Sequence, residues 1–320
     1  MTEQIENRRQ VPPAGARAAA ALQGFGDAIS RRLLACWLFW RYVSLRFWHD
    51  ELFTRAAALS FQTALAIVPL FTIAVTLLSA FPTFQELQSE VQIQLLTYLV
   101  PTVESSVVAA INDFIVKARQ LTAIGVLFLA FIAMMLLHTA SDTFDAIWRI
   151  TRPRTLAVRF MAYWAILTLG PLLFALGISL TAQVTAETQR QVGSVLGEDV
   201  GLIRQLAPVV MEWLGFTIIY WLAPSQRSSL RDAAAAAVVA AVLFQILKAG
   251  FAYYVVYISV YQTIYGAIAA LPFALLWLEF AWAVALFGAS VAAALPEWRN
   301  GTANPRTGRT RPNAAAPYDG

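Results

Sequence analysis

Three ionisable residues stand inside long apolar stretches of the sequence: Glu212, Lys248 and Glu279. A charge inside a lipid bilayer costs ~2.5–3.5 kcal/mol on insertion scales, so each one needs a partner or a watery cavity. Lys248 and Glu279 fall at comparable depth in successive stretches, which predicts an ion pair between them. Two interpretations stay open. In the first, the pair only fixes the register of the helices. In the second, Glu279 or Glu212 lines a polar cavity and changes its partner or its protonation as a substrate passes.

A second polar group lies at the C-terminal end of another apolar stretch. It consists of His138, Asp142, Asp145 and Arg149. Asp142, Asp145 and Arg149 are spaced i, i+3 and i+7, which places them on one helix face. A local Asp145–Arg149 ion pair is the simpler interpretation. The alternative is a functional polar cluster on the cytoplasmic side.

Four tyrosines recur every four residues, and they are Tyr253, Tyr257, Tyr261 and Tyr265. Tyrosine is enriched where a membrane meets water, so we expect an aromatic belt at the outer headgroup level. A stripe that contacts substrate is the other interpretation.

Residues for covalent or metal chemistry are scarce. The chain has one cysteine and two histidines, and it lacks the phosphate-loop, H-E-x-x-H and G-x-S-x-G motifs. We therefore expect no enzyme activity, no metal and no cofactor. Cys36 is expected to be an apolar filler.

The elements that must position these residues follow from composition. Hydrophobic residues make up 59% of the 320 residues and charged residues 13%, against ~45–50% and ~25% in soluble domains. A helix needs ~20 mostly apolar residues to cross a bilayer, and alternating strands of a barrel are not visible. The sequence predicts an all-α membrane bundle with six transmembrane helices, at about Leu52–Phe81, Leu121–Trp148, Leu156–Val184, Leu202–Ala223, Ala233–Val260 and Tyr265–Leu295.

The placement of arginines predicts the orientation. With the N-terminus inside, seventeen basic residues fall in inside segments and four in outside segments. Cytoplasmic loops carry the Lys and Arg excess, so both termini are expected in the cytoplasm of a bacterial inner membrane. Anionic lipid headgroups are the expected partners of this basic rim. Binding of nucleic acid is not expected, and a homo-oligomer is left open.

The segments outside the spans divide the chain further. Residues 27–48 are expected to form an interfacial amphipathic helix, or else a first-span extension packed on the bundle. Residues 82–120 predict two amphipathic helices that cap the outer face. The membrane domain then covers residues 27–298, and the tails 1–26 and 299–320 are predicted to be disordered.

The run RAAALSFQTALAIVPL, Arg55–Leu70, resembles the first-span signature of the YihY/BrkB family of bacterial membrane proteins, typically AAALSYYTLL…P. Phe61-Gln62 replaces the usual aromatic pair. Three further stretches agree, Trp148–Pro171, Tyr220–Tyr254 and Tyr265–Ala289, so the resemblance covers about Asp27–Leu295.

The resemblance implies a six-helix inner-membrane protein with both ends in the cytoplasm. It also implies a link to serum resistance and to transport of envelope lipids or solutes. An older family label, ribonuclease BN, fits poorly because two isolated histidines cannot supply metal ligands and a general base. We expect a protein that moves, or helps to move, an amphiphilic or anionic envelope component. The alternative is a structural scaffold for envelope integrity.

Overall fold

The computed structural model describes residues 14–79, 123–152, 154–170, 199–225, 228–257 and 270–310. The chain divides into two compact units. One unit, which we call the clasp unit, contains residues up to Arg46 and those from Glu297 onward; the other, the bundle unit, is Phe47–Pro296. The predicted outer cap, residues 82–120, lies outside the described residues.

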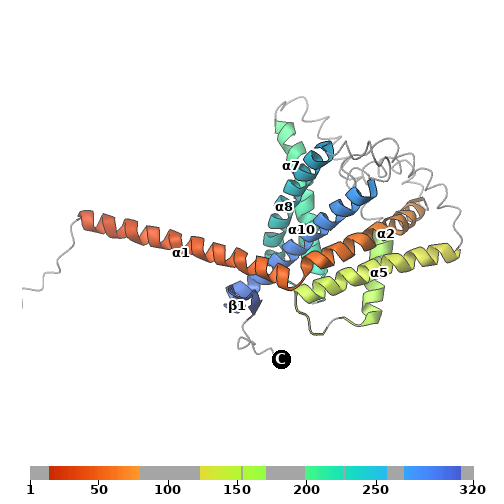
Figure 1. Cartoon of the computed structure of the whole chain (residues 1–320), viewed down its shortest axis with the longest axis horizontal. Coiled ribbons are helices and arrows are strands. Elements are labelled where there is room, and N and C mark those ends of the chain that lie inside the picture. The colour runs from red at the N-terminus through yellow and green to blue at the C-terminus, as the bar shows by residue number, and fades with distance from the viewer. Residues whose placement is uncertain are drawn as a thin grey trace, which may run out of the picture. The chain divides into compact units, whose positions relative to one another are not determined.

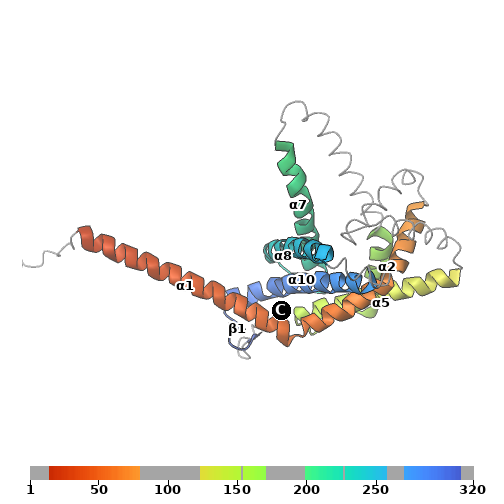
Figure 2. The ribbon, with the colours of Figure 1, turned by 45° about the horizontal axis from the view of Figure 1, so that its top comes forward.

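The bundle unit is built from helices, shown in Figures 1 and 2. Each lies where the sequence predicts an apolar stretch. They are α2 (Leu52–Ser79), α5 (Ala123–Ile147), the helix Leu156–Gly170, α7 (Asp199–Leu222), α8 (Leu230–Tyr257) and α10 (Ala270–Arg299), whose last residues belong to the clasp unit.

Three of the described helices are long and apolar enough to cross a membrane: Leu127–Ile147, Leu230–Tyr254 and Leu271–Arg299. Leu52–Ile67, Leu156–Gly170 and Val209–Leu222 are shorter apolar helices. The protein is therefore an all-α membrane protein, as its composition predicts.

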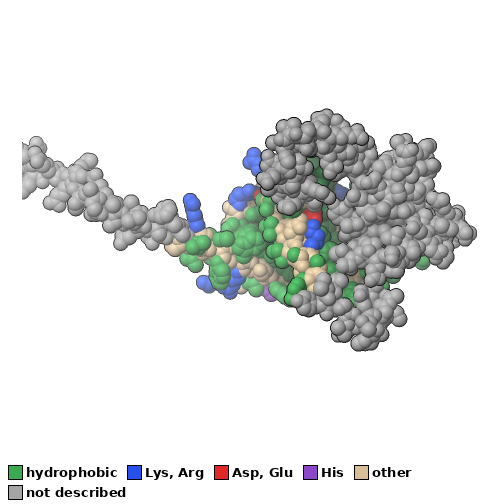
Figure 3. All heavy atoms as spheres, turned by 90° about the horizontal axis from the view of Figure 1, so that it is seen from above, with side chains coloured by type: hydrophobic (Ala, Val, Ile, Leu, Met, Phe, Trp, Pro, Cys, Tyr) green, Lys and Arg blue, Asp and Glu red, His purple; other side chains and the backbone are tan. Residues whose placement is uncertain are grey.

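Helix α8 illustrates how each helix divides into two faces. Its buried stripe is made of small residues, including Ala233, Ala237 and Ala240, which let neighbouring helices approach closely. Val238 and Ile246, on its other side, are exposed. Figure 3 shows a described surface of mainly hydrophobic side chains with a few charged ones among them. Large exposed apolar surfaces are unfavourable in water, so these faces suit contact with lipid.

Two pairs of helices make the most extensive contacts: α7 with α8, and α2 with α5 (Figure 1). Gly288 of α10 fits tightly against Tyr220 of α7 and Ala240 of α8. A Cβ built at Gly288 would lie 2.8 Å from the Ala240 Cβ. The Tyr220 hydroxyl donates a hydrogen bond to the Ala285 carbonyl of α10 at 2.9 Å. Three helices thus meet where only glycine leaves room.

The clasp unit joins helix α1 (Ala14–His49), as far as Arg46, to the C-terminal segment. Strands β1 (Ala303–Asn304) and β2 (Arg309–Thr310) form an antiparallel hairpin in that segment. Tyr42 donates a hydrogen bond to the Glu297 carboxylate at 2.6 Å, and the fully buried Arg46 forms an ion pair with the same carboxylate.

Two boundary predictions are wrong in this unit. Helix α1 begins at Ala14, although residues 1–26 were expected to be disordered. The alanines there are the strongest helix formers, which outweighs the polar residues nearby. In the other tail, residues 303–310 form the hairpin. Its Pro, Asn and Gly residues indicate a turn as readily as disorder, and Gly308 has the positive φ of 67° that its turn requires.

Candidate functional site

A polar group made of Glu212, Gln245 and Lys248 joins α7 to α8. The Lys248 ammonium pairs with Oε1 of Glu212, and the Gln245 side-chain amide donates a hydrogen bond to Oε2 at 3.0 Å. Both carboxylate oxygens are therefore engaged. Gln245 and Lys248 are three residues apart, so they share one helix face and reach the same carboxylate.

The two partners of this ion pair differ in exposure. The side chain of Glu212 is 13% exposed and that of Lys248 is 32% exposed. The Lys248 ammonium also lies 5.5 Å from the centre of the Phe244 ring, within the range of a cation–π contact. An ammonium has three N–H donors. Glu212 fixes one side of it, which leaves Lys248 able to bind an additional anionic group from the partly open side.

The predicted Lys248–Glu279 pair is wrong, because Lys248 forms its ion pair with Glu212. Sequence position predicts how deep each residue lies along its helix. It does not predict which neighbouring helix faces it, and α7 is the helix most extensively packed on α8. Among the described residues, Glu279 forms no ion pair or hydrogen bond, and its side chain is partly buried. Of the three predicted core residues, two come together.

The second polar cluster is centred on Arg159, which emerges from the helix Leu156–Gly170. Its guanidinium binds Asp142 through one nitrogen and Asp145, at 2.7 Å, through another. Asp145 also accepts hydrogen bonds from the Ser225 backbone N–H at 2.8 Å and from the Ser225 hydroxyl at 2.7 Å. His138 Nε2 lies 3.4 Å from the remaining Asp142 oxygen. The cluster joins α5, the next helix and the segment after α7.

Asp145 binds Arg159 and Ser225, two partners that the predicted local Asp145–Arg149 pair did not include. Arg149 adopts a φ of 54° just past the end of α5, where helices commonly end with a left-handed residue. From the sequence, Arg159 is only one of the basic residues of a segment expected on the cytoplasmic side. Its position one turn inside an apolar helix was the signal for a buried partner. Nothing in the sequence singled out Ser225.

The loops on either side of this cluster lie together. The Arg154 guanidinium donates a hydrogen bond to the Pro224 carbonyl at 3.2 Å, and Asp145 reaches Ser225 beside it. The segment after α5 and the segment after α7 thus meet at one end of the bundle unit. Both were expected on the cytoplasmic side.

The predicted tyrosine stripe is only partly within the described residues. Tyr253 is exposed near the end of α8, and Tyr257 is the last residue of that helix. Tyr261 and Tyr265 lie outside the described residues. Their role as a belt or a substrate contact stays a prediction.

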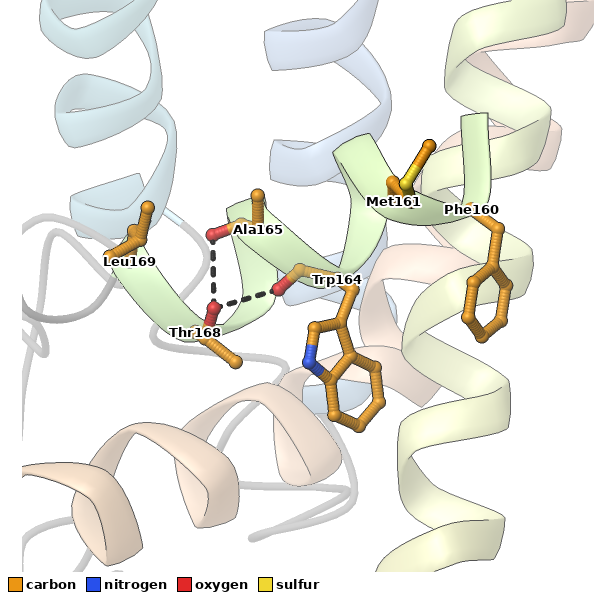
Figure 4. Close-up of a pocket in the computed structure, with 6 residues that line it drawn as sticks. All are labelled: Phe160, Met161, Trp164, Ala165, Thr168 and Leu169. Atoms are coloured by element: carbon orange, nitrogen blue, oxygen red, sulfur yellow. Dashed lines mark hydrogen bonds between the residues drawn. The ribbon is translucent and has the colours of Figure 1, made fainter. Parts of the chain in front are cut away.

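A shallow, open apolar surface lies along one side of the helix Leu156–Gly170 (Figure 4). It is lined by Phe160, Met161, Trp164, Ala165, Thr168 and Leu169, all from this helix. The one hydroxyl, on Thr168, donates to the Trp164 carbonyl at 2.9 Å. No charged group among the described residues lines it, so this surface suits acyl chains better than a polar substrate. Among the described residues, no group of His, Cys, Asp and Glu side chains could hold a metal ion.

Comparison with known proteins gives consistent matches. The family model described as virulence factor BrkB matches residues 43–313. UPF0761 membrane proteins of Nitrosospira multiformis and Rhodospirillum centenum are each 36% identical over 82% of this chain. The chain spans 61% and 58% of their lengths. A UPF0761 membrane protein of Aggregatibacter aphrophilus is 36% identical over 83% of this chain and 93% of its own. No solved structure matches.

Proposed function

The chain belongs to the BrkB family of membrane proteins, and we propose that this member moves, or helps to move, an amphiphilic or anionic envelope component across a membrane. The resemblance read from Arg55–Leu70 is thereby confirmed at the level of the family. The names of these relatives state no substrate and no activity. The proposal therefore rests on the chemistry of the polar group of α7 and α8.

The observation that carries it is the ion pair of Glu212 and Lys248 within apolar helices. A pair whose only role is to hold α7 on α8 needs no open side on its cation. Here the cation is a third exposed, while its carboxylate is held by Gln245 as well. A phosphate or carboxylate headgroup can therefore approach Lys248 without first removing Glu212.

The surroundings of Lys248 suit the apolar part of such a substrate. Phe244, over which the ammonium lies, contacts the Trp277 ring at 5.8 Å, and Trp277 contacts Phe251 at 4.9 Å. Phe251 continues to Tyr254 at 5.9 Å. This row of rings runs from the ion pair toward the end of α8. An amphiphile would place its charged group at Lys248 and its chain against Phe244 and Tyr254, the two rings of this row that are not buried.

We further propose the finer membrane arrangement: six transmembrane helices in a bacterial inner membrane, with both termini in the cytoplasm. The contact of Arg154 with Pro224 supports it, because both segments must then lie on one side. The exposed Trp37 and Trp40 of α1, with Arg41 5.4 Å from the Trp37 ring, suit an interfacial helix among anionic headgroups. The proposed activity needs no covalent step.

Flux measured in liposomes tests the proposal. Purified protein should move fluorescent anionic phospholipids between leaflets faster than it moves zwitterionic ones. Lys248→Met should abolish the preference, whereas Lys248→Arg, which keeps the cation, should retain most of it. Arg152→Ala, an exposed change in a loop, is the matched control. Equal flux in Lys248→Met and native protein, at equal folded fraction, would contradict the proposal.

A structural scaffold is the second candidate, and the Asp145–Arg159–Ser225 contacts favour it. Asp145 and Arg159 are buried, and together with the half-buried Ser225 they tie three segments together. If substitutions at Lys248 lower unfolding stability and leave no folded protein to assay, while flux is absent from the native protein, the scaffold is the better description.

A further inference from the structure

The side-chain amide of Gln245 has one end that Glu212 does not use. Its nitrogen donates a hydrogen bond to Oε2 of Glu212 at 3.0 Å. A carboxylate only accepts hydrogen bonds, so the amide nitrogen faces Glu212 and the amide oxygen points elsewhere. Among the described residues this oxygen accepts no hydrogen bond, and it is not one of the buried polar atoms that lack a partner. Gln245 therefore presents an accessible acceptor.

This acceptor lies in apolar surroundings. Gln245 belongs to the stretch Leu230–Tyr254 of α8, which is long and apolar enough to cross a membrane. A polar atom in such a medium is unfavourable unless it is hydrogen-bonded. Val242 and Ile246, which flank this side of the helix, are exposed. A lipid headgroup with a donor can therefore approach the oxygen from the lipid side.

The described donor side chains of α7 do not serve this oxygen, because each already has an acceptor. The Trp213 indole donates a hydrogen bond to the Ala234 carbonyl at 3.0 Å. Thr217 and Tyr220 donate to backbone carbonyls at 2.7 and 2.9 Å. The donor for Gln245 then has to come from water or from a bound molecule.

The Lys248 ammonium lies beside this acceptor. Gln245 and Lys248 are three residues apart on one helix face, and they engage the two oxygens of a single carboxylate. The ammonium and the amide oxygen are thus close enough for one headgroup to reach both. The ammonium binds an oxyanion, whereas the amide oxygen binds a hydroxyl or amine hydrogen. A ligand that uses both groups carries an anion and a donor.

The charge of the site limits which anion it holds. Lys248 and Glu212 form an ion pair, so their charges cancel. One negative charge is attracted to the open side of the ammonium, but a second would be repelled by the Glu212 carboxylate in a medium of low dielectric constant. A phosphomonoester carries up to two negative charges at neutral pH, whereas a phosphodiester carries one. The site therefore favours a phosphodiester.

We propose that Gln245 determines headgroup specificity and that the substrates are phospholipids with a singly charged, hydroxyl-bearing phosphodiester, the chemistry of a phosphoglycerol headgroup. Lys248 binds a phosphodiester oxygen, and Oε1 of Gln245 accepts a hydrogen bond from the headgroup hydroxyl. No covalent bond forms or breaks. This assignment rests on the proposed function of the same site, because it names the substrate class that the site selects.

Two lipids of equal charge test the assignment. Phosphatidylglycerol and phosphatidylmethanol with the same acyl chains are both phosphodiesters, and only the first carries headgroup hydroxyls. Native mass spectrometry of the purified protein in detergent measures how much of each is retained. Phosphatidylglycerol should be retained about two- to tenfold more strongly, the usual contribution of one neutral hydrogen bond. Its flux in liposomes should exceed that of phosphatidylmethanol by a similar factor.

Two variants assign the difference to Gln245. Gln245→Met keeps the length of the side chain and removes its oxygen, so the two lipids should be retained equally. The preference for both over zwitterionic phosphatidylcholine should remain, because Lys248 is still present. Trp213→Phe is the matched control, since it breaks a different hydrogen bond between α7 and α8. It should keep the discrimination of the native protein.

The outcomes separate this assignment from the proposed transport. Equal retention of the two lipids by native protein would overturn the assignment, and this comparison decides even if Gln245→Met does not fold. Discrimination that persists in Gln245→Met would overturn it as well, because the hydroxyl is then recognised elsewhere. Discrimination that depends on Gln245, without any flux, would support the headgroup assignment and count against transport.

Flux that prefers anionic lipids but does not distinguish these two would do the opposite.

Discussion

Asp142 and Asp145 share one arginine but are held in different ways. The side chain of Asp145 is 8% exposed and accepts three hydrogen bonds, from Arg159 and twice from Ser225. The side chain of Asp142 is 50% exposed and faces His138 on its open side. When a buried partner loses its charge, the remaining buried charge is left without a counter-charge. When an exposed partner loses its charge, water solvates the remaining charge.

We therefore expect the two aspartates to differ in their contribution to stability. Asp145→Asn should lower the free energy of unfolding by about 3–5 kcal/mol, the usual loss when a buried ion pair loses one partner. Asp142→Asn should cost about 1 kcal/mol or less. Unfolding in mixed detergent micelles, followed by tryptophan fluorescence, measures both. Equal losses in the two variants would mean that Asp145 is not the buried anchor.

The sequence predicts how deep a charged residue lies along its helix, but not which partner it binds. The depth of Lys248 along α8 follows from counting residues, and its need for a carboxylate follows from the cost of a buried charge. Its choice of Glu212 over Glu279 depends on which helices pack together, and a single sequence does not contain that. Arg159 could have been suspected from its apolar neighbours. Ser225 could not, because it acts through loop geometry.

At the scale of the elements, α7, α8 and α10 meet at Gly288. The helix propensity of glycine is poor, so an interior glycine needs a packing reason. Here the reason is direct, since a Cβ at Gly288 would collide with the Tyr220 side chain and Ala240. Gly215, in the middle of α7, has nothing within 4 Å of the place a Cβ would occupy.

These two glycines give opposite predictions for substitution by alanine. Gly288→Ala should lower unfolding stability by about 1–3 kcal/mol, the usual cost of overpacking. Gly215→Ala should raise it by about 0.5–1 kcal/mol, because alanine favours the helix. The same micelle unfolding assay compares them. A neutral Gly288→Ala would show that the three helices are further apart than described.

The element boundaries show where sequence patterns suffice. Where the structure describes both sides of a helix end in the bundle unit, apolar length predicts that end to within a few residues, because lipid-facing and buried faces are both apolar. It fails for residues 303–310, where a hairpin of four strand residues is held by Gly308 against Leu45. Contacts so distant in sequence leave no periodic signal. The 14–26 part of α1 was missed because no hydrophobic stretch marks it.

At the scale of the whole molecule, the membrane topology can be tested through the loops that meet beside Asp145. Thr151 and Ser229 are exposed in the two segments. In a Cys36→Ser background, Thr151→Cys and Ser229→Cys should both react with a membrane-impermeant maleimide only when inverted vesicles expose the cytoplasmic face. Reaction from opposite faces would overturn the arrangement of six spans. Intact cells are the matched control, in which neither cysteine should react.

The clasp unit carries an implication for biogenesis. Arg46 reaches its carboxylate across a sequence separation of 251 residues. A ribosome therefore releases α1 among the first segments and supplies Glu297 and the hairpin near the end. Until then Arg46 lacks the Glu297 carboxylate, and the lipid surface or an insertase has to keep α1 from aggregating. Premature termination before Glu297 would yield chains that quality-control proteases can recognise.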